Sequence, residues 1–462
     1  MVHQYINNGY RIILDVNSGS VHVVDEMVYE LVAYLKDNNQ GAGKLEADIY
    51  SGACDHFREK YEETQIKEAL DEINELIESG QLFTEDIYES YVKDFKKRDT
   101  VVKALCLHIA HDCNLACQYC FAEEGEYHGR RALMSYEVGK KALDFLIQNS
   151  GSRRNLEVDF FGGEPLMNFS VVKQLVAYGR EQEKIHDKNF RFTLTTNGVL
   201  LNDEILEFLN QEMANVVLSI DGRKQVNDKM RPFRSKKGSY DLIVPKFQKV
   251  AESRNQTNYY VRGTFTRNNL DFSEDVLHLA DLGFEQISVE PVVAAKTEDY
   301  ALRKEDVPMI CQQYDKLAKE MVKRSREGKC FQFFHFMIDL QGGPCVAKRI
   351  SGCGSGTEYL AVTPWGDFYP CHQFVGEEKF LLGNVDTGIV NTDMVETFRG
   401  CNVYAKDKCK NCFAKFYCSG GCAANAYNFH GSINDVYEIG CELQRKRVEC
   451  AIMIKAALAQ EE

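Results

Sequence analysis

Residues 113–120, Cys-Asn-Leu-Ala-Cys-Gln-Tyr-Cys, carry three thiols at a C-x3-C-x2-C spacing. The three are Cys113, Cys117 and Cys120. They follow an apolar run, residues 105–109, which predicts a buried strand. A [4Fe–4S] cluster normally takes four cysteine thiolates, so three thiols leave one iron able to bind another molecule. Zinc is the alternative, because His108 and His111 are near enough in sequence to complete a four-ligand site.

Short apolar runs and helical patterns alternate on both sides of this loop, from residue 104 to residue 292. Such alternation predicts a parallel sheet wrapped by helices, and six strands make a partial barrel. The predicted strands are residues 105–109, 156–161, 192–195, 216–220, 259–265 and 287–289. In folds of this kind the loops that follow the strands carry the functional residues. We therefore expect the active site where the six strands end.

Polar and glycine-rich motifs follow three later strands of this predicted barrel. Residues 161–165, Phe-Gly-Gly-Glu-Pro, end the second strand. Their glycines allow a ligand to approach the backbone, and their carboxylate suits an ammonium group. Residues 195–198, Thr-Thr-Asn-Gly, and residues 219–222, Ser-Ile-Asp-Gly, end the third and fourth strands. Each motif alone predicts only a turn or a strand cap, but their common place at successive strand ends predicts one binding site.

The cysteine loop and these motifs together resemble the radical S-adenosylmethionine (SAM) superfamily, in which C-x3-C-x2-C follows the first strand of a partial (β/α)6 barrel. The resemblance implies that the three cysteines hold a catalytic [4Fe–4S] cluster whose open iron binds SAM, the source of a 5′-deoxyadenosyl radical. It also implies a set of SAM contacts. They are Tyr119 at the adenine, Gly162, Gly163 and Glu164 at the amino group, Thr195, Asn197, Ser219 and Asp221 at the ribose and carboxylate, and Arg231 and Arg262 at the carboxylate. For both arginines an ion pair of the surface or barrel wall is the alternative.

A second group of cysteines lies near the C-terminus. Seventeen cysteines in a chain without an export signal predict metal ligation more than disulfides. Seven of them have a spacing that includes C-x2-C-x5-C-x3-C and G-x4-C. They are Cys353, Cys371, Cys409, Cys412, Cys418, Cys422 and Cys441. The pattern resembles the SPASM extension of peptide-modifying radical SAM enzymes, which binds two auxiliary [4Fe–4S] clusters, whereas a zinc ribbon would use only four of these thiols.

The same resemblance implies how the seven thiols divide. One cluster takes Cys409, Cys412, Cys418 and Cys441, and the other takes Cys353, Cys371 and Cys422. The fourth ligand of the second cluster is open between Cys345, Cys401 and no protein ligand. An iron without a fourth protein ligand would bind a substrate thiolate, because soft sulfur ligands suit iron in such clusters. With the catalytic cluster, three [4Fe–4S] clusters are expected.

The first 90 residues predict a small separate module. Residues 10–16 and 21–24 are β-branched runs around an Asn-Ser-Gly-Ser turn and predict a hairpin, and residues 26–35 and 64–79 have helical periodicity. A hairpin followed by helices resembles the winged-helix-like peptide-recognition element of enzymes that modify ribosomally made peptides. Such elements bind a leader peptide as an added strand. A stabilising cap on the barrel is the alternative.

The module, the barrel and the cysteine-rich segment together resemble the thioether-forming (sactionine) maturases of six-cysteine (SCIFF) peptides. The resemblance implies a bond between a Cys sulfur and an α-carbon in a cysteine-rich precursor peptide with a leader. It also implies a reductant such as flavodoxin or ferredoxin. Two alternatives are a formylglycine-forming sulfatase maturase and a non-catalytic iron–sulfur electron carrier, although a carrier would not need the Gly-Gly-Glu-Pro and Thr-Thr-Asn-Gly motifs.

Length and composition limit the domains, partners and location of the chain. A net charge of −14 argues against nucleic-acid binding, and the 462 residues contain neither a signal peptide nor an apolar run of membrane-span length. We therefore expect a cytoplasmic protein. The expected domains are residues 1–90 (recognition), 91–103 (linker), 104–300 (barrel), 301–344 (connecting helical segment) and 345–462 (SPASM). After a connecting helix near residues 306–327, the remainder up to residue 450 is expected to be loop-rich and to need a covalent or metal staple in order to fold.

Overall fold

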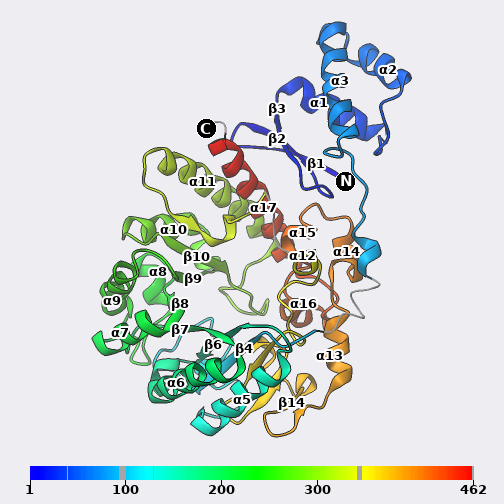
Figure 1. The fold of residues 1–462 in the computed structure, drawn as a ribbon. Coiled ribbons are helices and arrows are strands. Elements are labelled where there is room, and N and C mark those ends of the chain that lie inside the picture. Colours follow the sequence, from blue (N-terminus) through cyan, green and yellow to red (C-terminus); the bar gives the residue numbers. More distant parts are fainter. Residues whose placement is uncertain (39, 93–99, 128, 341–345, 460–462) are drawn as a thin grey trace.

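A sheet of parallel strands forms the centre of the protein (Figure 1). The computed structural model, which describes residues 1–38, 40–92, 100–127, 129–340 and 346–459, has six neighbouring parallel strands in the order β10-β9-β8-β7-β6-β4. They are β4 Ala104–His111, β6 Asn155–Gly162, β7 Asn189–Thr196, β8 Met213–Ser219, β9 Tyr259–Phe265 and β10 Gln286–Pro291. The helices between them are α5 Tyr136–Asn149, α6 Phe169–His186, α7 Asp203–Glu212, α8 Lys224–Met230, α9 Tyr240–Ser253 and α10 Phe272–Asp281. The predicted alternation of strands and helices is confirmed.

Side chains alternate across these strands, as β7 illustrates. Phe190, Phe192 and Leu194 are buried, and Phe192 lies against α6, because apolar side chains gain free energy by leaving water. Thr193 and Thr195 point to the opposite face, away from α6, and are less buried. Polar side chains therefore line the inside of the barrel, where the strands end at the predicted motifs.

The sheet continues from β4 into the C-terminal part of the chain. β12 Tyr359–Val362 runs parallel to β4, and the strands after it are antiparallel to their neighbours. These are β13 Asp367–Tyr369, β14 Gly383–Asn384 and β15 Gly388–Ile389. Two short strands complete the sheet, β5 Ala132–Leu133 on β4 and β11 Gln332–Phe333 on β10. This mixed sheet joins the barrel to the predicted SPASM domain.

The C-terminal part contains more helix than predicted. Its helices are α12 Val346–Ser351, α13 Thr392–Arg399, α14 Asp407–Lys410, α15 Lys415–Cys418, α16 Ala423–His430 and α17 Glu438–Ala459. α17 packs along α11 Val307–Arg326 (Figure 1). Its buried residues lie on several sides, so it lacks the single apolar stripe that identifies a helix in sequence. The prediction of loops up to residue 450 is therefore wrong from residue 438. Among the described helices, α17 included, none has both the length and the apolar character that crossing a membrane requires.

An antiparallel sheet and three helices form the N-terminal module. The sheet has the order β1-β2-β3, with β1 Val2–Asn7, β2 Tyr10–Asp15 and β3 Val21–Val24. The helices are α1 Glu26–Asp37, α2 Ala47–Phe57 and α3 Glu63–Glu78, which share a small core with the sheet. The predicted hairpin corresponds to β2 and β3, whereas β1 and α2 were not predicted. The winged-helix resemblance and the domain boundaries stay predictions.

The N-terminal sheet contacts the side of the barrel through β1. Tyr5 donates a hydrogen bond to Glu449 O of α17 at 3.1 Å, and Asn7 Nδ2 donates to Asp315 Oδ1 of α11 at 2.7 Å. These contacts place α11 and α17 beside β1. β1 and β3 are the two edge strands of this sheet, and β2 is the described strand partner of each.

Candidate active site and iron–sulfur sites

The three cysteines predicted to hold the catalytic cluster lie on the loop that follows β4. Main-chain hydrogen bonds of 2.9 Å hold this loop against the end of α8 and the residues directly after it. One joins Ala116 N to Pro232 O, and the other joins Gln118 N to Met230 O. Because these bonds do not use the thiols, the loop is fixed while its three sulfur atoms stay available as ligands.

The Gly-Gly-Glu segment packs backbone to backbone against the cysteine loop. Gly163 N donates to Ala110 O at 2.7 Å, and Glu164 N donates to Asp112 O at 2.9 Å. A Cβ atom at position 163 would lie 2.2 Å from that Asp112 oxygen. At Gly162, where φ is +121°, a Cβ atom would lie 2.4 Å from Ala110 O. Both glycines are therefore required by the close approach of the two loops.

Glu164 is fully buried and joins the ends of β6 and β7. Its Oε2 accepts from Asn197 N at 2.8 Å, and its Oε1 accepts from Thr196 Oγ1 at 2.8 Å. Burial raises the pKa of Glu164, and these hydrogen bonds act against that rise. The side-chain Nδ2 of Asn197 donates to Asn114 Oδ1 at 2.7 Å and lies 3.7 Å from Cys113 Sγ. Two predicted SAM contacts, Glu164 and Asn197, thus lie beside the cysteine loop.

Tyr119, Asp221 and Arg231 form a buried polar network on the other side of the loop. The Tyr119 hydroxyl donates to Asp221, whose Oδ1 and Oδ2 lie at 2.7 and 2.8 Å, and it accepts from Arg231 Nη1 at 3.0 Å. Burial raises the pKa of Asp221 to about 6, although Arg231 and Tyr119 favour its charged form. Among the described residues, Arg231 Nε has no hydrogen-bond partner. That N–H is therefore free to donate to an anionic group such as a carboxylate.

Arg262 lies beside Ser219 in the sheet, but it forms the ion pair that was the alternative to SAM binding. Its Nη2 is 3.6 Å from Glu290 Oε1. Glu290 also lies 3.5 Å from His335 Nε2 in η6 Phe334–Phe336 and 4.0 Å from Arg447 Nη2 in α17. Burial lowers the pKa of His335 to about 3, so this side chain is neutral near neutral pH. Glu290 was not predicted from the sequence, although its place near the end of the sixth predicted strand was a signal. No sequence signal marked His335 or Arg447.

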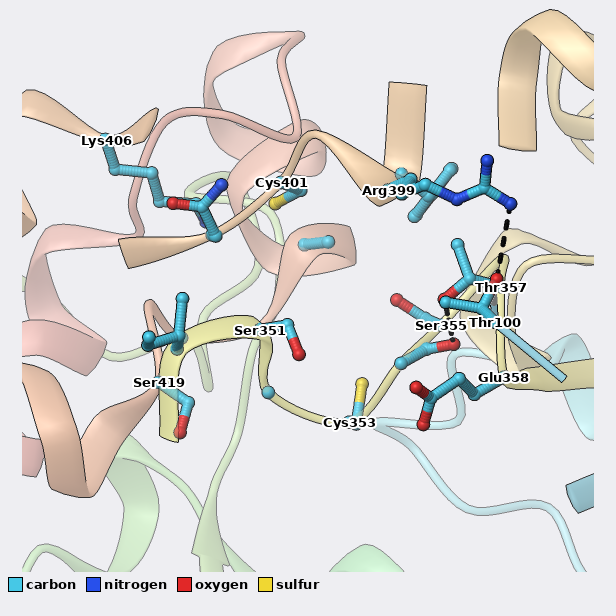
Figure 2. A pocket seen from close by; sticks show the side chains of 17 residues that line it. Thr100, Ser351, Cys353, Ser355, Thr357, Glu358, Arg399, Cys401, Lys406 and Ser419 are labelled. Atoms are coloured by element: carbon cyan, nitrogen blue, oxygen red, sulfur yellow. Dashed lines mark hydrogen bonds between the residues drawn. The ribbon is translucent and has the colours of Figure 1, made fainter. Parts of the chain in front are cut away.

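Thiols predicted to hold one auxiliary cluster lie around a pocket of the C-terminal part (Figure 2). Cys353, after α12, and Cys401, after α13, both line it. Burial raises the pKa of Cys371, and the nearby thiols of Cys422 and Cys353 add to the rise. The Cys401 thiol donates to a main-chain carbonyl at 3.4 Å. Cys345 lies outside the described residues, so the structure brings together the three predicted ligands and one of the candidates for the fourth.

Four thiols line a second pocket nearby. They are Cys409, Cys412, Cys418 and Cys441, the predicted ligands of the other auxiliary cluster. They come from α14, the residues after it, the end of α15, and α17. Burial raises the pKa of Cys441 to about 12, and the neighbouring thiols of Cys418 and Cys409 add to the rise. Iron would replace these protons, since thiolates are its ligands, and the donor set fits a [4Fe–4S] cluster.

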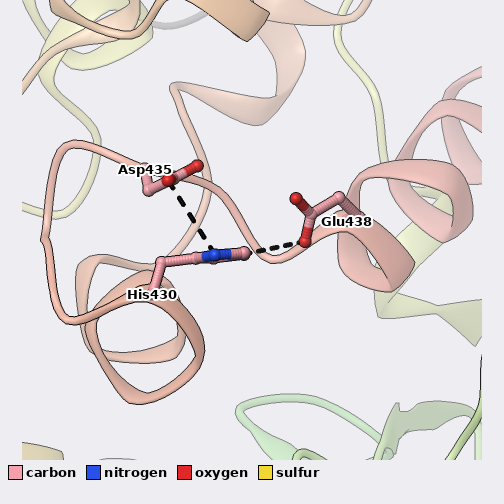
Figure 3. A group of neighbouring side chains, drawn as sticks. All are labelled: His430, Asp435 and Glu438. Carbon is pink, nitrogen blue, oxygen red and sulfur yellow. Dashed lines mark hydrogen bonds and ion pairs between the residues drawn. The ribbon is translucent and has the colours of Figure 1, made fainter.

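His430, Asp435 and Glu438 form a group of possible metal ligands near the surface (Figure 3). His430 Nε2 lies 2.9 Å from Glu438 Oε2. The ammonium of Lys408 lies 2.7 Å from Glu438 Oε1 and 3.4 Å from Asp435 Oδ1. Because this lysine already neutralises both carboxylates, we interpret the group as an ion-pair network that joins α14, α16 and α17.

Comparisons with known proteins place iron–sulfur domains in the same two parts of the chain. A family model described as a 4Fe-4S single cluster domain matches residues 102–244, and the SPASM model, an iron–sulfur cluster-binding domain, matches residues 353–413. The cysteine-type anaerobic sulfatase-maturating enzyme of Clostridium novyi (strain NT) is 24% identical over 72% of this chain and 90% of that protein. The antilisterial bacteriocin subtilosin biosynthesis protein AlbA of Bacillus subtilis (strain 168) is 25% identical over 69% of this chain and 67% of that protein. The crystal structure of Streptococcus suis SuiB bound to precursor peptide SuiA has a TM-score of 0.54 at 15% identity and covers 94% of this chain and 97% of that chain.

Proposed function

Because the chain belongs to the radical SAM family with a SPASM domain, whose members act on peptides or proteins, we propose that it forms thioether crosslinks in a cysteine-rich precursor peptide. The bond would join a Cys sulfur to an α-carbon. SAM, three [4Fe–4S] clusters and a reductant such as flavodoxin or ferredoxin would serve the reaction. The many cysteines without an assigned disulfide partner favour a reducing, cytoplasmic compartment.

The observation that carries the proposal is a contact between two cluster-binding parts of the chain. Phe121, which follows Cys120, and His372, which follows Cys371, have ring centroids 5.6 Å apart. The ring of Phe161, in β6, lies 5.1 Å from the same histidine ring. The catalytic cysteine loop thus adjoins one auxiliary site. We infer that one bound peptide would present a carbon atom to the first site and a sulfur atom to the second.

The chemistry of the crosslink fits this arrangement. When bound, the catalytic cluster and SAM supply a 5′-deoxyadenosyl radical, which removes one hydrogen atom from the α-carbon. The cysteine thiol must also lose a proton, and one electron must leave as the carbon–sulfur bond forms. We assign Cys353, Cys371 and Cys422 to an auxiliary cluster with an open iron, which would hold the deprotonated sulfur and accept that electron.

The N-terminal module supports recognition of a leader peptide along β3. The barrel helices contact the sheet on its β1 side. Asn8 Nδ2, directly after β1, donates to Asp315 O of α11 at 3.1 Å, and His3 of β1 lies 3.0 Å from Glu449 Oε1 of α17. A peptide would add a strand at either edge of this sheet, and we propose β3, the edge strand on the far side of β2 from these contacts. Tyr5, Ile12 and Leu14 also belong to the main core, so deletion of the whole module would expose apolar side chains of the barrel wall. Single substitutions on β3 test recognition better than truncation.

Mass spectrometry of a cysteine-rich precursor peptide, incubated with the enzyme, SAM and reductant, tests the proposal. A thioether lowers the peptide mass by two hydrogen atoms per crosslink, and a peptide with Ser in place of the donor Cys is not crosslinked. Formylglycine is the second candidate, which the similarity to a sulfatase-maturating enzyme favours. It forms with loss of the cysteine sulfur and reacts with hydrazides. A peptide that loses its sulfur in this way contradicts the thioether proposal.

A further inference from the structure

Lys406 is a buried lysine whose charge no described carboxylate balances. Lys406 is only 2% exposed, and its Nζ donates to Gly420 O at 2.9 Å. In the described part of the chain, no Asp or Glu lies within ion-pair distance of this ammonium, whereas the neighbouring Lys408 contacts two carboxylates. Burial of an ammonium group is costly unless an opposite charge compensates it. The surroundings of Lys406 should therefore supply an anion of another kind.

A second buried lysine of the same domain has its charge balanced by a carboxylate. Lys415 is 3% exposed, and its Nζ lies 2.5 Å from Asp86 Oδ2 and 3.2 Å from Lys410 O. Its charge is balanced by that carboxylate, which comes from a distant part of the chain. The two lysines are equally buried, and they differ in that only Lys415 has a carboxylate partner among the described residues.

Lys406 lies where the two auxiliary sites meet. Gly420, which accepts its hydrogen bond, is the middle residue of the turn Cys418-Ser-Gly-Gly-Cys422. The first cysteine of this turn is assigned to one auxiliary cluster, and the second is assigned to the other. The carbonyl of Lys406 also accepts from Cys409 N at 2.9 Å. Its backbone thus holds the loop of one cluster, while its side chain holds the turn that both clusters share.

Lys406 lies near thiols of both sites. Lys406 lines the same pocket as Cys353 and Cys401 (Figure 2). Burial raises the pKa of four nearby thiols, and the charge of Lys406 acts against that rise in every one of them. They are Cys401, Cys409, Cys418 and Cys422. The anionic groups that Lys406 can neutralise are therefore thiolates of both auxiliary sites.

We propose that Lys406 is the shared counter-ion of the two auxiliary iron–sulfur clusters and raises the reduction potential of at least one of them. This inference rests on the cluster assignment of the proposed function. A thiolate-ligated cluster carries negative charge and becomes more negative on reduction. A buried cation close to it stabilises the reduced form, because the surrounding dielectric constant is low. Lys406 is thus a positioning residue that acts on the clusters and does not touch the peptide.

Redox titration followed by electron paramagnetic resonance tests this role in the full chain. Cys113, Cys117 and Cys120 are replaced by Ala, so that only the auxiliary clusters contribute to the spectra. In this background Lys406→Gln removes the charge but keeps a donor for Gly420 O, and Lys406→Arg keeps the charge. Lys408→Met is the matched control, because Lys408 is 58% exposed and paired with Glu438.

We expect Lys406→Gln to lower the equilibrium constant for one-electron reduction of an auxiliary cluster about tenfold or more, a potential lower by about 59 mV. Lys406→Arg should change it less than about threefold because the charge is kept, and Lys408→Met should also change it less than about threefold because surface charges are screened. Unchanged potentials in Lys406→Gln with full iron content, or an equal shift in Lys408→Met, overturn the inference. If Lys406→Gln loses iron and Lys406→Arg does not, the inference is supported. If both variants lose iron, the inference is overturned. A background protein with clearly fewer than about eight irons refutes the cluster assignment itself, and the inference with it.

Discussion

Substitution of Gly163 by alanine should disable the SAM site through the backbone. The new Cβ atom would lie 2.2 Å from Asp112 O, and Cβ atoms do not approach other heavy atoms within 3.0 Å. The two loops must therefore separate by about 0.8 Å. That same oxygen accepts from Glu164 N at 2.9 Å, so the shift stretches this bond beyond hydrogen-bond length and strains the bond from Gly163 N to Ala110 O. Loss of one or two buried hydrogen bonds costs about 2–4 kcal/mol of free energy. This cost corresponds to a decrease of about 30-fold or more in a rate or equilibrium constant that depends on the intact site.

Reductive cleavage of SAM to 5′-deoxyadenosine, measured without peptide, is the assay for Gly163→Ala. We expect a rate at least about 30-fold lower than that of the wild type and a matching loss of SAM affinity. Gly43→Ala is the control, because a Cβ atom there has nothing within 4 Å. Wild-type cleavage by Gly163→Ala, at wild-type iron content, would refute the conclusion that the close backbone approach shapes the SAM site.

Three further predictions concern separate parts of the chain. Replacement of Cys113, Cys117 and Cys120 by Ala should abolish 5′-deoxyadenosine formation but leave the C-terminal iron, and cleavage at the wild-type rate rules out this cluster assignment. Val23→Asp on β3 should weaken leader binding about tenfold or more in a fluorescence anisotropy titration. Ile6→Asp on β1 is the control, because Ile6 is 58% exposed, and it should not weaken binding. Equal effects of the two variants reject β3 as the binding edge. Burial lowers the pKa of His335 from 6.5 to about 3, so the unfolded chain binds a proton at this residue more readily than the folded protein does. The free energy of unfolding is therefore highest above pH 6.5 and decreases as the pH falls toward 3. Chemical denaturation should show about 1.4 kcal/mol lost from this residue at about pH 5.5 relative to pH 7.5, and His335→Gln should remove that loss; an unchanged pH dependence in the variant contradicts the assignment.

The amino-acid sequence alone determined the parts of this protein that depend on short spacings. Three thiols within eight residues can share one metal centre wherever the loop folds, so C-x3-C-x2-C predicted the catalytic cluster site. The C-x2-C-x5-C-x3-C run is local in the same sense. Short apolar runs that alternate with helical patterns located all six barrel strands, because helices cover the sheet and keep the strands apolar. α17 and β1 were missed, since α17 is buried on several sides and β1 carries polar residues between apolar ones.

The tertiary structure decided every interaction that joins distant residues. Arg262 pairs with Glu290 in the next strand, and that carboxylate also meets a histidine and an arginine from two later elements. The burial of Lys406 beside the turn that the two cluster sites share also could not be predicted from the sequence. The physical reason is the same in both cases. The energy of a charge depends on its distance to other charges and on its exclusion from water, and both quantities are fixed only when the elements pack.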